Sequence, residues 1–190
     1  MRGIGTRTIA AMTPAILAIG GVALAPVAAS AQEPSPYAGW ESRPIKALSP
    51  EEVASLRAGE GMGYGLAAEL NGYPGPRHVL DLADSLDLSS AQRDAVEAVR
   101  ARMKARAVEL GEEIVLAEAA LDSLFAAGAI DDGALRSRVD GIARLEGELR
   151  AAHLAAHLET RAILTGHQMA RYATLRGHAG AGDHGAHVHE

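Results

Sequence analysis

The chain contains no cysteine, few aromatic residues and no excess of basic charge. Without cysteine, no disulfide, thiolate metal site or cysteine nucleophile is available, so stability must come from packing. One Trp, four Tyr and one Phe in 190 residues, beside abundant Ala and Leu, favour helices over a pleated sheet. Acids outnumber Lys and Arg by 24 to 18, which argues against binding of nucleic acid or of an anionic lipid surface.

The first 31 residues have the composition of a cleavable signal peptide. A start with two arginines and no acid precedes an apolar run over residues 8–27, which ends at the small-x-small pattern Ala29-Ser30-Ala31. We expect cleavage before Gln32, a periplasmic location and no membrane insertion of the mature protein. Retention of residues 1–31 as an anchor is the alternative. Later apolar runs are too short for a membrane span.

The mature chain is expected to be one helical domain with extended ends. Residues 32–47 hold three prolines and no periodicity, so they predict an extended leader on which Tyr37 and Trp40 dock against the domain. The tail, residues 178–190, is rich in Gly and His and predicts an unstructured segment. The domain between them spans residues 48–177.

Two long amphipathic helices dominate this domain. Apolar residues recur every three or four positions from Ser90 to about Phe125, and again from about residue 132 to about Leu164. A short link that contains Asp131 and Asp132, either of which can cap the return helix, makes the two helices antiparallel. Shorter helices are predicted at 50–58, 66–70, 76–87 and 166–176, separated by turns rich in Gly and Pro.

A repeated motif precedes two of these helices. Leu88-Ser89-Ser90-Ala91-Gln92 and Leu164-Thr165-Gly166-His167-Gln168 share the pattern L-[ST]-x-x-Q, in which Leu88, Ser89, Gln92, Leu164, Thr165 and Gln168 are the matching residues. Each copy is a capping box. Two copies around a helical hairpin, behind a signal peptide, resemble the Spy/CpxP family of periplasmic proteins, which includes zinc-responsive members and CnrX-like metal sensors.

The resemblance covers about residues 78–177 and implies a four-helix protein that forms a homodimer. Family members act as ATP-independent chaperones of unfolded proteins, as partners of membrane sensor kinases, or as metal-responsive proteins. The chain departs from the family in two respects: it is acidic where the best-known chaperones are basic, and residues 37–76 extend the usual amino-terminal part. The first departure weakens the transfer of a mechanism in which positive charge attracts clients.

Histidines are the candidate metal ligands. His153 and His157 lie one turn apart near the edge of the packed face of the return helix, a spacing that allows both to bind one Zn, Ni, Co or Cu ion. His78 and His167 are plausible further ligands. The alternative is structural packing of both imidazoles against Glu146, Glu148 or Glu112. In the tail, His184, His187 and His189 predict either loose metal chelation or a solubilising segment.

Leu154 and Leu158 lie on the side of the return helix that faces away from the hairpin partner. They predict cover by the terminal helices, a dimer interface or a client-binding surface. No catalytic motif is present, so we expect no enzymatic activity and no required cofactor. Two functional hypotheses follow: a periplasmic stress protein of the Spy/CpxP type, acting as chaperone or adaptor, and a periplasmic metal sensor or resistance protein.

Overall fold

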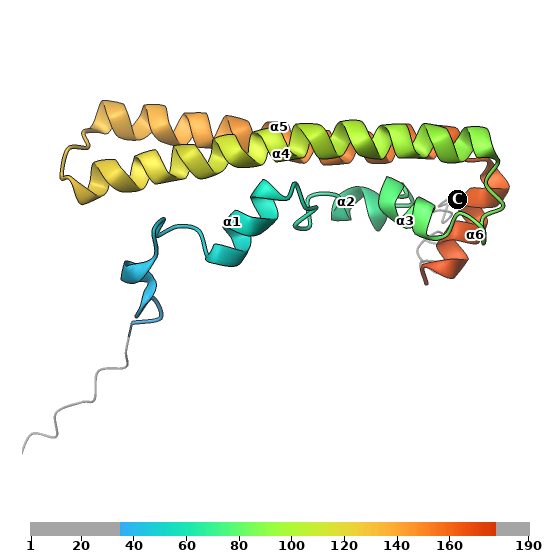
Figure 1. The fold of residues 1–190 in the computed structure, drawn as a ribbon, viewed down its shortest axis with the longest axis horizontal. Helices are drawn as coiled ribbons and strands as arrows, with labels where there is room; N and C mark the ends of the chain where they lie inside the picture. The colour runs from blue at the N-terminus through green and yellow to red at the C-terminus, as the bar shows by residue number, and fades with distance from the viewer. Residues whose placement is uncertain (1–34, 178–190) are drawn as a thin grey trace, which may run out of the picture. The chain divides into compact units, whose positions relative to one another are not determined.

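The computed structural model describes residues 35–177 of the chain (Figure 1). Every regular element in this range is helical, which confirms the predicted all-α class. The signal-peptide prediction for 1–31 and the tail prediction for 178–190, including its histidines, lie outside the described residues. In chain order the elements are the 3-10 helix η1 (Trp40–Ser42) and the α-helices α1 (Pro50–Arg57), α2 (Leu66–Glu69), α3 (Pro76–Asp81), α4 (Ser90–Ala126), α5 (Asp132–Ile163) and α6 (Gly166–Leu175).

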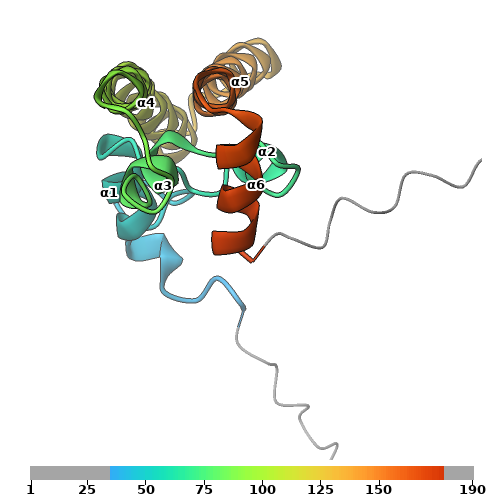
Figure 2. The same ribbon diagram turned by 90° about the vertical axis from the view of Figure 1, so that its right-hand side faces the viewer.

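Helices α4 and α5 form the predicted antiparallel hairpin and run side by side in Figures 1 and 2. Helix α4 ends before Gly128, whose φ of 60° is a left-handed conformation suited to glycine. The side chain of Asp131 then accepts a hydrogen bond from the Ala134 amide at 2.7 Å and caps α5. The short link and the two apolar stripes were therefore sufficient to predict this pair.

The segment α1–α3 packs along one side of the hairpin. Seen end-on in Figure 2, α1 and α3 lie below α4, whereas α2 lies below α5. The end of α1 crosses α4 at Gly111, where an added Cβ would lie 2.6 Å from the carbonyl carbon of Leu56 and still closer to its oxygen. Only glycine allows the two backbones to approach this closely.

The amino-terminal segment differs from the prediction in detail. Residues 35–47 form turns and η1 instead of an extended leader. Tyr37 and Trp40 remain exposed and pack edge-to-face on each other, with ring centroids 5.3 Å apart, while the buried Ile45 joins the core. Helix α3 ends at Asp81, earlier than the predicted end at residue 87. Residues 82–87 form turns instead, and Asp87 has a left-handed conformation with φ 52°. The described range thus contains six α-helices, as the residue pattern predicts, where the family resemblance implies four.

The two L-[ST]-x-x-Q motifs meet in space. Ser89 and Thr165 both form the predicted capping boxes, and the two glutamines of these boxes pair with each other. The Gln92 amide donates to Gln168 Oε1 at 2.9 Å, and the Gln168 amide donates to Gln92 Oε1 at 3.1 Å. Gln168 also donates to the Leu86 carbonyl at 3.2 Å. This clasp holds the start of α4, the start of α6 and the turn after α3 together.

Buried side chains gather in two clusters. One joins α1 to the middle of α4 and α5 and includes Leu56, Leu110 and Leu149. The other joins α3 and α6 to the start of α4 and includes Val79 and Val96. Within the described range, no helix combines the length and the apolar character that a membrane span requires.

Candidate functional site: the histidine groove

A cavity of about 630 Å³ lies between the hairpin and the segment α1–α3. We call it the histidine groove because His78, His153 and His157 all line it. Its walls also include Glu69 and residues of the glycine-rich loop 59–65. Three cationic side chains and two Met side chains line it as well: Arg77, Arg100, Lys104, Met62 and Met103. His78, one of the two further ligand candidates from the sequence, thus lines the same cavity as the two histidines of α5.

His153 is buried at the inner wall of the groove. Its residue is only 6% exposed, and Nε2 is a buried atom without a hydrogen-bond partner. Tyr64, from the loop before α2, stacks on the imidazole with ring centroids 5.8 Å apart. Burial lowers the pKa of His153, and the nearby His157 and Lys104 lower it further, so the ring is neutral at pH 7. A neutral ring with an unused nitrogen can bind a ligand or a metal ion.

His157 is held by backbone. Its Nδ1 donates to the Tyr73 carbonyl at 2.7 Å, since a carbonyl oxygen only accepts. Nε2 faces Gly65, and an added Cβ at Gly75 would lie 2.9 Å from Cε1 of the ring. The glycines of both turns therefore make room for this imidazole. The carboxylate of Glu69 lies 3.8 Å from Nδ1.

Glu69 is a buried carboxylate whose oxygens are already engaged. It accepts hydrogen bonds from the hydroxyl of Tyr172 and from the Gly75 amide at 2.9 Å, and Arg176 Nε lies 3.4 Å away. Burial alone would raise the pKa of Glu69, but these donors outweigh it and hold the pKa below its usual value. The cluster ties α2 to α6 and keeps a charged carboxylate beside the groove.

The other predicted ligands divide between the groove and the surface. His78 is half-buried, with Nδ1 3.9 Å from Asp81 Oδ2, and burial is the main cause that lowers its pKa. His167 is exposed on α6 and does not line the groove. Among the residues that the structure describes, no three His, Asp or Glu side chains converge in a geometry that would hold a metal ion.

Glu112 and Glu148, two of the three acidic residues predicted as possible partners of His153 and His157, are engaged elsewhere. Glu112 pairs with Arg57 at 2.8 Å, and Glu148 pairs with Arg106 and Arg144, each at 2.6 Å. Helix periodicity predicts that both histidines lie at the edge of the α5 face that packs against α4. The segment α1–α3 adds a further layer over that edge, and Tyr64 and Tyr73 become their neighbours.

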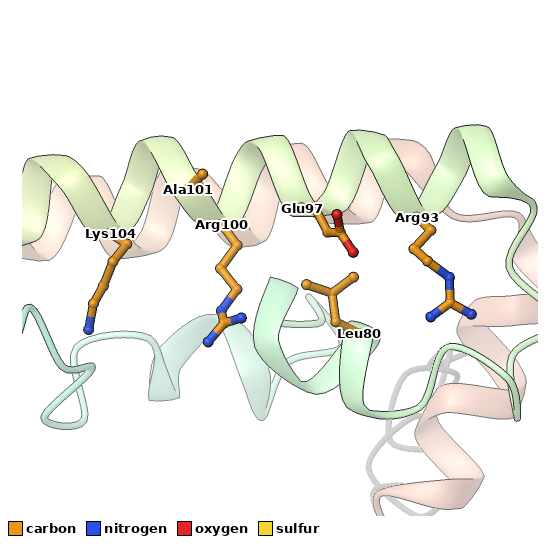
Figure 3. A pocket seen from close by; sticks show the side chains of 6 residues that line it. All are labelled: Leu80, Arg93, Glu97, Arg100, Ala101 and Lys104. Atoms are coloured by element: carbon orange, nitrogen blue, oxygen red, sulfur yellow. The ribbon is translucent and has the colours of Figure 1, made fainter.

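Arg100 and Lys104 are groove residues that sequence reasoning missed. They lie one turn apart on α4 and point toward the segment α2–α3 (Figure 3). Both also line an adjoining hollow of about 560 Å³, together with Leu80, Arg93 and Glu97. The only sequence signal was their spacing of four on the polar face of α4, which is common on solvated helices.

Apolar side chains are exposed at both ends of the hairpin. Leu158, near the end of α5, is 59% exposed, so the terminal helices do not cover it, whereas Leu154 is partly buried. Toward the hairpin turn, the exposed large apolar residues are Leu116 and Phe125 on α4 and Leu135 and Val139 on α5. Residues 132–141 of α5 contain no buried side chain.

Comparison with known proteins gives no match to a family model, to a curated protein or to a solved structure. The resemblance to the Spy/CpxP family therefore remains a prediction that rests on the two motifs and their positions.

Proposed function

We propose that the protein is an exported, non-enzymatic binding protein of the Spy/CpxP type, which holds unfolded chains or a membrane sensor on the apolar surface of its hairpin. The observation that carries this proposal is the uncovered hairpin end. Phe125 and Val139 are 56% and 47% exposed, respectively, although both belong to helices whose other halves are well packed. Clustered apolar side chains on a protein surface are typical of interaction sites.

The same surface supports a homodimer. The apolar stripe of α4 and α5 extends beyond the segment α1–α3, and a second copy of the chain would cover this part. In an isologous dimer, both subunits would use the same apolar surface. Burying a Phe or Leu side chain contributes about 1.5–3 kcal/mol, so four or five such residues provide a substantial driving force. A dimer that exchanges with clients would serve both roles.

The test is suppression of aggregation of a reduced, unfolding client protein without ATP. Phe125→Asp/Val139→Asp should abolish suppression and shift sedimentation toward a monomer, because a charge cannot be buried cheaply against apolar surface. Ser137→Asp, at the same end of α5 and also exposed, adds a charge away from the apolar side chains and should retain both properties. Equal suppression by all three proteins would refute the assigned surface.

Transition-metal binding in the histidine groove is the second candidate. It is favoured by the three imidazoles that line one cavity, of which His153 has an unused nitrogen and a lowered pKa. Equilibrium dialysis with Zn, Ni, Co and Cu would give stoichiometric binding that is lost in His153→Gln/His157→Gln. The exposed His167→Gln is the matched control, and deletion of residues 178–190 separates any contribution of the tail.

A further inference from the structure

The histidine groove contains two cations without partners. Within the described residues, neither Arg100 nor Lys104 forms a hydrogen bond or ion pair, although other basic residues of α4 do: Arg93 pairs with Asp84, and Arg102 pairs with Glu159. In a chain of net charge −6, acids to neutralise a surface cation are plentiful. Two unpaired cations one turn apart on the wall of a cavity therefore form a local positive field within an acidic protein.

The imidazole of His153 lines the same cavity, and its buried Nε2 has no hydrogen-bond partner. Leaving a buried polar atom without a partner is unfavourable, so a ligand that satisfies Nε2 gains affinity. Lys104 is close enough to His153 to lower its pKa. A neutral imidazole can offer an N–H to a bound oxygen at this position.

Charge decides which class of ligand fits. Arg77, Arg100 and Lys104 line the groove, against the carboxylates of Glu60 and Glu69. The oxygens of Glu69 already accept hydrogen bonds, and Glu60 is exposed. A bare divalent cation would meet like charge, whereas an oxyanion would meet a guanidinium, an ammonium and an N–H donor. Arginine and lysine bind carboxylate and phosphate oxygens through charge-assisted hydrogen bonds.

We propose that the histidine groove binds a small oxyanion, a phosphate or a carboxylate, between Arg100 and Lys104, with His153 Nε2 donating to one of its oxygens. The adjoining hollow of Figure 3 shares both cations and is also lined by Glu97, so it provides space for an uncharged remainder of a larger anion. This site is independent of the apolar hairpin surface. Each can therefore fail without affecting the other.

The test is calorimetric titration of the purified protein at low salt with inorganic phosphate, with sulfate and with succinate. At least one probe should bind saturably, and the preferred probe distinguishes a phosphate site from a carboxylate site. Arg100→Gln/Lys104→Gln should weaken binding by about tenfold or more, the loss of roughly 1.4 kcal/mol. Arg136→Gln/Arg138→Gln removes the same charge from exposed positions near the hairpin turn and should change affinity less than about twofold.

A second readout follows the imidazole directly. The ¹⁵N resonance of His153 Nε2 should shift on anion binding in the unmodified protein and not in Arg100→Gln/Lys104→Gln, whose circular dichroism spectrum should be unchanged. The proposal is overturned if none of the three anions binds, or if both double variants lose affinity equally. Stoichiometric Zn²⁺ binding that needs His153 and is indifferent to Arg100 and Lys104 would instead assign the groove to a metal.

Discussion

The two halves of the hairpin share one sequence pattern and have different surroundings. Toward the clasp of Gln92 and Gln168, α4 and α5 are covered by α1–α3 and α6, and their stripe residues Val96 and Ala156 are almost completely buried. Beyond Asp122, which pairs with Lys46, the stripe continues through Leu124 on α4 and Leu135 on α5, yet these side chains are partly or largely exposed.

The difference shows that amphipathic periodicity selects a face and does not determine what covers it. In the covered half, the short segments supply a third layer that buries a histidine and a carboxylate. In the uncovered half, each helix has only the other helix for cover, and a pair of helices cannot bury a wide stripe. Stability should therefore reside in the covered half and binding of partners in the uncovered half.

Among the variants that test this difference between the two halves, Gly111→Ala should have the largest effect on stability. The added Cβ would clash with the backbone of Leu56, so α1 must move away or the helix must shift, at a cost of about 1–3 kcal/mol or more. Urea denaturation measures the loss. Gly147→Ala on α5, where a Cβ meets no atom within 4 Å, should stabilise the protein by about 0.5–1 kcal/mol. Similar losses in both variants would contradict the close crossing.

Gln168→Ala tests the clasp. It removes the partner of Gln92 and the donor to the Leu86 carbonyl, and an unsatisfied buried group costs about 1–3 kcal/mol. Asp131→Ala, which removes only a cap at the exposed hairpin turn, should cost about 1 kcal/mol. A double-mutant cycle with Gln92→Ala should give a coupling energy of about 0.5–3 kcal/mol; strict additivity would show that the two amides do not pair.

Acid should weaken the covered half first. The pKa of His153 is lowered by burial and then by His157 and Lys104, so the unfolded chain takes up a proton at a higher pH than the folded protein does. The resulting stability is complete above the ordinary histidine pKa of about 6.5 and is lost as pH falls through the lowered value.

As the pH falls below about 6.5, the free energy of unfolding should therefore decrease, by no more than about 1.4 kcal/mol per pH unit for one group. His153→Gln should reduce this dependence without removing it, because burial also lowers the pKa of His78; the exposed His167→Gln is the control. Urea denaturation over the pH series measures the slope. A dependence of equal steepness in His153→Gln would assign it to other groups.

The smallest effect on stability is expected at the uncovered end. Phe125→Ser removes a side chain that is 56% exposed, so the isolated chain should lose less than about 0.5 kcal/mol. If the end is an interface, the loss should increase with protein concentration, because association stabilises the folded state. A large loss that does not depend on concentration would instead place Phe125 in the core of a single chain.

The local elements of this protein were predictable from sequence. Capping boxes at Ser49, Ser89 and Thr165 and the two periodic stripes predicted the helix starts and the hairpin. Each of these signals involves residues three or four positions apart, and such residues meet in any helix regardless of the rest of the chain. The groove was only partly predictable: helical spacing paired His153 with His157, whereas His78 was one of two candidates for the third histidine.

Only the tertiary structure determined which parts of the hairpin are covered and which side chains meet in the groove. Glu69 and Tyr172 are separated by 103 positions and Gln92 and Gln168 by 76, and no periodicity indicates that they meet. The burial of His153, the placement of Arg100 and Lys104 on the groove wall, and the exposed end of the hairpin all depend on where the segment α1–α3 packs. That position is set by close approaches such as Gly111 on Leu56, because an interaction between distant segments exists only once both are folded against each other.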